Sequence, residues 1–292
     1  MLKKMTIPEM IGQLIMHAIM ILAVIICLYP VILTLMVSFT DEVTLMRNGM
    51  QLIPEVFSLD AYRLIFANNT VGNAYLVTIT VTVIGTALSL LICGMAGFAM
   101  SLNTLKYRNI AALFFYIPMV FNAGLLPWFL VSTQLYGLTN RFHALIIPLL
   151  VSSFNVFLMR NYFKTISPSL IESAQMDGCG AFRIFITIVM PLSAPVIATV
   201  SLFIGLTYWN DWTMALWFIN NPRMYPLQYM LFQIRAIMDQ IRMHGTLGGH
   251  IDIPSQTYQV ATLFVTIGPI VLLYPFVQRY FVKGIMIGAV KG

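Results

Sequence analysis

The sequence predicts an all-α membrane protein with six transmembrane helices. Its 292 residues are 59% apolar and only 9% charged, whereas about 25% of the residues in an ordinary soluble domain are charged. The charges also fall in clusters between long apolar runs, and a run of about 18 or more apolar residues is long enough to span a membrane as a helix. Six such runs occur, at residues 13–37, 73–101, 110–131, 143–160, 191–219 and 256–278.

The loops between these runs predict the orientation of the chain. Cytoplasmic loops of membrane proteins carry an excess of lysine and arginine. With the N-terminus inside, the inner segments hold ten of the 16 basic residues and three of the ten acidic residues, which leaves +7 inside and −1 outside. Both termini are therefore expected in the cytoplasm. The net charge of +6 becomes a topology signal in this way, and no nucleic-acid partner is expected.

The first two runs are expected to be complete spans. Residues 11–40 carry no charge, and this stretch is too long for a signal peptide, whose apolar region has about 7–15 residues. The second run has small residues at every fourth position, at Gly85, Ser89, Cys93, Gly97 and Ser101. Small residues allow membrane helices to approach closely, so this helix is predicted to pack against protein.

Polar side chains and prolines interrupt the third and fourth runs. Pro118 and Pro127 free backbone carbonyls in the third run, and such groups need protein or water beside them. Asn122 lies between the two prolines, and Asn155 lies in the fourth run. Two interpretations stay open for these asparagines. Their side chains form hydrogen bonds with a neighbouring helix, or they line a polar substrate path.

A polar and aromatic group marks the outer end of the fifth run. It consists of Tyr208, Trp209, Asn210 and Asp211. Aromatic faces and amide or carboxylate groups are suited to a sugar ring and its hydroxyls, which makes these residues candidates for the substrate path. Aromatic residues also anchor helices at the membrane interface, and this second interpretation stays open.

Two outer segments are long enough to have structure of their own. Residues 41–71 contain the turn signal Asn48-Gly49 and are expected to form a small cap. Residues 227–243 are predicted to form a short amphipathic helix outside the membrane. This helix is either a docking surface or a packed lid.

The inner segment between the fourth and fifth runs, residues 164–190, contains signals for a short helix. Pro168 suits a first helical turn, and Ser169 with Glu172 fits a capping box. Gly178 suits the position just after a helix. These signals predict a helix over 169–178, which is too short and too polar to cross a membrane, followed by a second helix over 181–190.

The same segment resembles a known family signature. Glu172-Ser173-Ala174, Gly178, Ile188 and Met190-Pro191 have the spacing of the motif E-A-A-x3-G-x9-I-x-L-P, found in permease subunits of binding-protein-dependent ABC importers. Ser173 and Met190 depart from the motif by small or apolar changes. Residues 278–284 and 288–292 resemble the C-terminus of the sugar-uptake subgroup that contains the second maltose-transporter permease. The resemblance covers nearly the whole chain.

The resemblance implies a type I ABC importer permease fold, with a single permease domain over 1–292 and a cytoplasmic tail at 279–292. It places the chain in a bacterial plasma (inner) membrane. The implied partners are a second homologous permease subunit, two ATPase subunits on the cytoplasmic face and an extracytoplasmic solute-binding protein, besides the lipid bilayer. The helix at 169–178 becomes the coupling helix, and the residues implied to meet the ATPase or shape this loop are Glu172, Ser173, Ala174, Asp177, Gly178, Ile188 and Pro191.

No catalytic or metal site is expected in this chain. The sequence lacks a phosphate-binding G-x-x-x-x-G-K-[ST] loop, H-E-x-x-H and G-x-S-x-G. ATP hydrolysis is therefore expected in the separate ATPase subunits, which bind ATP and Mg. The alternative is an ion-coupled secondary transporter, for which only His17 is a candidate intramembrane ionisable group. A third class, an intramembrane enzyme, has only His143 with Ser152 or Ser153 as candidate parts.

The resemblance also suggests a class of cargo. In its fifth run the chain resembles permeases that import oligosaccharides from plant or algal polysaccharides. These include uronate-rich oligosaccharides such as alginate or pectin fragments. An acidic oligosaccharide is the resulting expectation.

Overall fold

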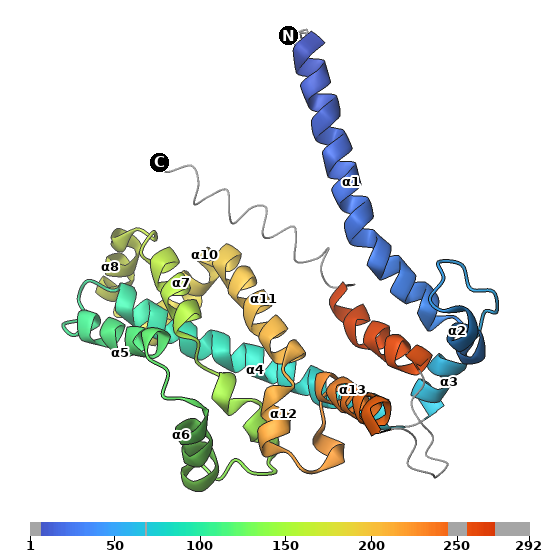
Figure 1. Cartoon of the computed structure of the whole chain (residues 1–292). Coiled ribbons are helices and arrows are strands. Elements are labelled where there is room, and N and C mark those ends of the chain that lie inside the picture. Colours follow the sequence, from blue (N-terminus) through green and yellow to red (C-terminus); the bar gives the residue numbers. More distant parts are fainter. Residues whose placement is uncertain (1–6, 68, 245–255, 272–292) are drawn as a thin grey trace. The chain divides into compact units, whose positions relative to one another are not determined.

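The computed structural model describes residues 7–67, 69–244 and 256–271, and the regular elements in these ranges are helices (Figure 1). The longer α-helices are α1 (Ile7–Ser38), α3 (Asp60–Ala67), α4 (Asn69–Ser101), α5 (Arg108–Val120), α7 (Ser153–Phe163), α8 (Pro168–Met176), α11 (Ala194–Asn210), α13 (Leu227–His244) and a last helix at 256–271. The shorter elements are α2 (Glu42–Asn48), α6 (Leu125–Leu130), η1 (Val131–Leu135), η2 (Phe142–Leu145), η3 (Ile147–Leu149), α9 (Ala181–Ile184), η4 (Phe185–Val189), α10 (Met190–Leu192), α12 (Thr213–Phe218) and η5 (Pro222–Met224).

The all-helical prediction is confirmed, but most predicted spans are not straight helices. Among the described residues, only Met10–Ser38 and α4 are by themselves long and apolar enough to cross a membrane. Three bent helix pairs raise that number to five at most, with bends of 115° between α5 and the α6–η1 helix, 51° before α7 and 91° before α11. The six-span count stays a prediction, since residues 272–278 of the last predicted span lie outside the described residues.

The bends have local causes in the sequence. α5 ends at Val120, and Gly124 precedes α6 with a φ of 85°, a left-handed conformation that favours glycine. The amide of Gly124 donates to Asn122 Oδ1 at 2.9 Å. In the fifth predicted run, 191–219, the chain leaves the helix at Asp211 and starts α12. That run therefore contains separate helices and is not one continuous helix.

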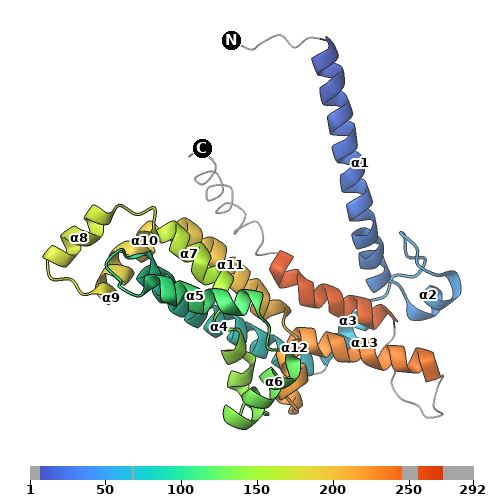
Figure 2. The same cartoon turned by 60° about the vertical axis from the view of Figure 1, so that its left-hand side comes forward.

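The described residues divide into two compact units. The N-terminal unit contains 7–67 together with 234–244 and 256–267, and the central unit contains 69–233 with 268–271. In the central unit, α4 packs against both α7 and α11. α8 lies at one end of this unit, whereas α6 and α12 lie at the opposite end (Figures 1 and 2).

Four of the five residues of the small-residue stripe of α4 are buried, as predicted, and Ser101 at its end is half-buried. Gly85, Ser89, Cys93 and Gly97 are all buried against neighbouring elements. A Cβ atom on Gly97 would lie 3.1 Å from the backbone nitrogen of Arg160 and from the backbone oxygen of Val156. α4 and α7 therefore approach each other through their backbones at this glycine.

The N-terminal unit is held together around the end of α1. The ring of Phe39 stacks on Phe57 and on Tyr62, at centroid distances of 5.3 and 5.2 Å. The large apolar side chains of α1 between Met10 and Tyr29 are exposed. Within the described structure nothing covers them, so α1 has the surface of a helix that lies in lipid or against another protein.

Glu42, at the start of α2, closes the N-terminus of the last helix. Its carboxylate oxygens accept hydrogen bonds from the amides of Gln256 and Thr257, both at 3.0 Å, and from Thr257 Oγ1 at 2.7 Å. A carboxylate here satisfies free N–H groups and interacts favourably with the helix dipole. The contact joins the predicted outer loop to the last predicted span.

We expect Glu42→Ala to lower the stability of the purified transporter by about 1–2 kcal/mol, the usual cost of losing a helix cap. Thermal unfolding in detergent measures the change. Glu55→Ala is the matched control, because Glu55 is an acid of the same loop whose hydrogen bond to Asn48 is exposed. Equal destabilisation by both variants would contradict the capping role.

Candidate coupling segment and substrate path

The helix predicted over 169–178 is present as α8, with a different start from the one expected. Pro168 occupies its first turn as predicted, but Ser167 is the N-cap residue and makes no side-chain capping bond. The predicted capping box of Ser169 and Glu172 is wrong, because Ser169 lies inside the helix and its hydroxyl bonds to that of Ser167 at 2.8 Å. The fixed φ of Pro168 suffices to start the helix.

The end of α8 is the glycine-closed turn that the sequence predicts. Gly178 has a φ of 77°. Its amide donates to the carbonyl of Gln175 at 3.0 Å, and the amide of Cys179 donates to the carbonyl of Ala174 at 2.9 Å. This pair of bonds is a Schellman motif, which requires a left-handed residue at Gly178. The next helical run, α9 with η4 and α10, leads to Pro191 and α11.

One side of α8 packs on the protein and the other is free. Ala174 is buried, with 7% of its surface exposed. Glu172 and Ser173 are exposed, and two large apolar side chains, Leu170 and Met176, are 48% and 89% exposed. Asp177 and Gly178 are exposed as well. The free face therefore combines apolar side chains with carboxylates.

An aromatic cluster connects this segment to the long helices. Phe185 in η4 is 1% exposed. Its ring stacks on Phe98 of α4 at 5.7 Å and meets Phe163 of α7 edge-on at 6.5 Å. Phe98 and Phe163 also meet edge-on at 6.5 Å. The Phe98–Phe163–Phe185 cluster thus attaches the helical run that follows α8 to α4 and α7. Its three phenylalanines lie far apart in the sequence and have no shared spacing, so no sequence pattern predicts this cluster.

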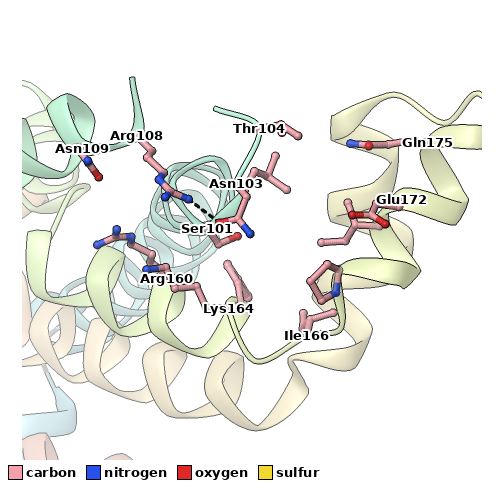
Figure 3. Close-up of a pocket in the computed structure, with 14 residues that line it drawn as sticks. Ser101, Asn103, Thr104, Arg108, Asn109, Arg160, Lys164, Ile166, Glu172 and Gln175 are labelled. Carbon is pink, nitrogen blue, oxygen red and sulfur yellow. Dashed lines mark hydrogen bonds between the residues drawn. The ribbon is translucent and has the colours of Figure 1, made fainter. Parts of the chain in front are cut away.

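A cleft separates α8 from the ends of α4, α5 and α7, with a volume of about 360 Å³. Figure 3 shows Arg108, Arg160 and Lys164 on one side and Glu172 with Gln175 on the α8 side. We call it the basic cleft. Its residues belong to two sequence clusters that the charge count had assigned to inner loops.

The candidate substrate-path residues lie toward the other end of α11, and several have structural partners. Tyr208 is buried, and its hydroxyl donates to the carbonyl of Ile146 at 3.0 Å. Asp211 accepts bonds from the amides of Thr213 and Met214, at 3.3 and 3.2 Å, and so caps α12. These two residues hold the fold together whether or not substrate touches them.

The remaining candidates are not gathered in one place. Trp209 is buried, whereas Asn210 is exposed and its side-chain oxygen accepts from Gln228 Nε2 of α13 at 3.2 Å. Asn155 is buried in α7 with 6% exposed, and Asn122 is exposed at the break between α5 and α6. In the described ranges no hydrogen bond joins Asn122 or Asn155 to residues 208–211.

A set of hydrogen bonds around Asn140, near the same end of the central unit as α12, was not predicted. Asn140 has a φ of 53°, and its Oδ1 accepts from the amides of Asn220 and Asn221 at 3.2 and 3.0 Å. Its own amide donates to the carbonyl of Phe218 at 2.6 Å. Asparagine tolerates the left-handed region, so Thr139-Asn140 is a turn signal in the sequence. The sequence does not indicate that Asn140 bonds to residues 218–221.

Comparisons with known proteins identify the family. A family model described as "Binding-protein-dependent transport system inner membrane component" matches residues 95–287. The chain belongs to this family. The permease is 36% identical over 281 residues to the "Polygalacturonan/rhamnogalacturonan transport system permease protein YtcP" of Bacillus subtilis (strain 168), covering 96% of this chain and 98% of that protein.

Two further similarities agree with this assignment. The permease is 32% identical over 276 residues to the "Arabinooligosaccharides transport system permease protein AraQ" of Halalkalibacterium halodurans, covering 91% and 92% of the two chains. It also matches a chain in the crystal structure of a bacterial ABC transporter involved in the import of the acidic polysaccharide alginate. That match has a TM-score of 0.84 and 26% identity, and covers 95% of this chain and 99% of that chain.

These findings confirm the main sequence-based prediction. The chain is a multi-pass membrane permease subunit of a binding-protein-dependent ABC transport system, with the helical fold of such permeases, and it is not an enzyme by itself. Membership of the family implies a solute-binding protein and an ATPase as partners.

Proposed function

We propose that the permease is the translocation subunit of an ATP-driven oligosaccharide importer and that α8 is its coupling helix. The observation that carries this proposal is the construction of the α8 segment. A helix closed by Gly178 exposes Glu172 and Met176 one turn apart on the same side, and the helical run after it is fixed to α4 and α7 through Phe185. A large exposed apolar side chain beside a carboxylate suits a contact with another protein.

The assembly that follows from this role has several parts. The permease spans the membrane six times with both termini in the cytoplasm, as one permease domain, and pairs with a second homologous permease. Two ATPase subunits bind ATP and Mg on the cytoplasmic face, one of them against α8, and closure of the ATPase pair moves the α8 segments. The exposed apolar surface of α1 supports a place for it in lipid or against the second permease.

The cargo is an oligosaccharide, with a preference for acidic fragments such as those of alginate or pectin. The names of two similar proteins support this preference, since one transports polygalacturonan and rhamnogalacturonan and the other belongs to an alginate importer. The substrate path includes Asn122 and Asn210, whose side chains are exposed although each also has a hydrogen-bond partner in the protein. The wall of the path behind these two asparagines is supported by four residues: the buried Asn155, Tyr208 and Trp209, and Asp211, which caps α12.

The coupling role is tested by exchanging exposed groups of α8. Glu172→Ala combined with Met176→Ser removes the carboxylate and the apolar contact without a change in packing, because both side chains are exposed. We expect co-purification of the ATPase to fall at least about tenfold, the usual effect of losing two central contact residues. Uptake of labelled oligogalacturonate or oligoalginate should fall with it.

The control removes a charge from the opposite end of the central unit. Arg141→Gln lies in the predicted outer segment and is exposed, so it should leave association with the ATPase unchanged. Normal ATPase association and uptake in the α8 double variant would reject α8 as the coupling helix. Uptake of a neutral oligosaccharide with no uptake of uronate oligomers would reject only the cargo preference.

A further inference from the structure

The basic cleft has an excess of positive charge that the described protein does not neutralise. Arg108 begins α5, while Arg160 and Lys164 belong to the end of α7, and a single carboxylate, Glu172, lies on the facing wall (Figure 3). Across the described ranges, none of these four side chains forms an ion pair within 4.0 Å. Three cations converging on one space favour an anion there.

Two of the three cations are held in place by backbone and side-chain contacts. The Arg160 Nε donates to the carbonyl of Met100 at 3.3 Å, and its guanidinium lies 5.9 Å from the ring centre of Phe157. Arg108 donates to Asn103 Oδ1 at 2.5 Å. Each guanidinium keeps further N–H donors without a partner in the described structure. Fixed donors in this number match a group with several acceptor oxygens, such as a phosphate.

The start of α5 adds to this preference. Arg108 and Asn109 line the basic cleft at the first turn of α5, a helix of 13 residues. Tyr107, the N-cap residue, makes no side-chain capping bond. The positive end of the helix dipole therefore faces the same space as the three cations, and a helix N-terminus favours phosphate groups.

The position of the cleft indicates which phosphate it meets. The apolar helices α4 and α7 end at Ser101 and Phe163, and α5 begins at Arg108, so the cleft lies where three helices reach one boundary of the apolar layer. The headgroups of the bilayer lie at that depth. The count of basic residues assigns this end to the cytoplasmic leaflet, where basic pockets between transmembrane helices bind anionic headgroups.

We propose that the basic cleft binds a phosphate group and that its source is the headgroup of an anionic phospholipid of the cytoplasmic leaflet. The apolar side chains of Leu102, Ile166 and Ile171 also line the cleft and suit the glycerol and upper acyl chain. This inference rests on the proposed function only for the membrane orientation. Because Glu172 and Gln175 form the α8 wall, a bound headgroup braces α8 against the ends of α5 and α7.

The test counts bound lipids on the complete purified transporter in nanodiscs of phosphatidylcholine with increasing phosphatidylglycerol. Native mass spectrometry gives the affinity for phosphatidylglycerol. The triple variant Arg108→Gln, Arg160→Gln, Lys164→Gln should lower this affinity by about tenfold or more. Glu172→Gln should raise it, because a like charge is removed from the facing wall. Lys106→Gln is the matched control, since Lys106 lies over the ring of Tyr107 and does not line the cleft.

Further arms separate the possible outcomes. Unchanged phosphatidylglycerol affinity in the triple variant, or an equal loss in Lys106→Gln, overturns the proposal. Displacement of the lipid by millimolar inorganic phosphate or glycerol 3-phosphate overturns the lipid as the source. Lys164→Gln alone, at an exposed position, gives a well-folded variant in which a loss of several-fold is still expected. Normal ATPase association in the α8 double variant, together with a lowered phosphatidylglycerol affinity in the triple variant, would reject the coupling role and leave this proposal standing.

Discussion

Replacing Gly97 with leucine should abolish assembly of the transporter. At this position the backbones of α4 and α7 are in contact, and even one added carbon would lie 3.1 Å from two backbone atoms of α7 and 3.3 Å from the Cβ of Met159. Backbone atoms in a helix cannot rotate away as a side chain can, so the two helices must separate. Overpacking of this kind costs about 1–3 kcal/mol for small insertions and more for a whole leucine side chain.

The measurement is the yield of monodisperse transporter after detergent extraction, together with its uptake rate. Gly97→Ala should show an intermediate loss, because α7 has to shift by only a few tenths of an ångström. Gly72→Leu is the control on the same helix, since a Cβ at Gly72 meets no atom within 4 Å. Wild-type yield from Gly97→Leu would mean that α4 and α7 do not pack closely in the membrane.

The importance of Gly97 illustrates what the sequence was able to predict. The four-residue spacing of small residues in α4 is a local pattern, and local patterns reveal which face of a helix is buried. The same holds for the α8 segment, where Pro168 and Gly178 mark both ends of the helix. In each case the information lies within one turn or one stripe of the chain, so no knowledge of distant contacts was needed.

Predictions that depended on distant contacts fared less well. The composition of residues 191–219 predicts one apolar run, yet α11 ends at Asn210, and the carboxylate of Asp211 accepts from amides at the start of a new helix, α12. Tyr208 appeared suited to a sugar, but its ring lies where a Cβ on Gly85 would be, and its hydroxyl bonds to Ile146. Composition shows that a polar side chain lies in an apolar run. Only the folded structure shows whether that side chain already has a hydrogen-bond partner in the protein.

The charge clusters also separate what a local pattern predicts from what depends on distant contacts. Counting lysines and arginines by loop predicts an inner surface, but the count treats Arg108 and Arg160 as independent although 52 positions separate them. Only the packing of α4, α5 and α7 against one another brings them to one cleft beside α8. Likewise, the E-A-A motif identifies α8 and Gly178, while the ring that attaches the segment to the long helices, Phe185, stands at one of the motif's variable positions.

Phe185→Ala should uncouple ATP hydrolysis from transport. The ring fills the space between α4 and α7, with its tip 3.0 Å from where a Cβ on Gly94 would lie. Removing it leaves a cavity and costs about 3–5 kcal/mol of local packing. The free face of α8 is unchanged, so the ATPase should still bind. The closing motion of the ATPase, however, then reaches α4 and α7 only through a loosened contact. We therefore expect sugar uptake per ATP hydrolysed to fall at least about tenfold.

The ratio of uptake to hydrolysis in proteoliposomes distinguishes this effect from simple damage, which lowers both rates together. Phe185→Leu should restore most of the ratio, because leucine fills much of the same volume. Phe114→Ala is the control, since this ring is 70% exposed on α5 and outside the cluster. A normal ratio in Phe185→Ala would show that force reaches the long helices by another route, of which the helical run from η4 through α10 to α11 is the covalent candidate.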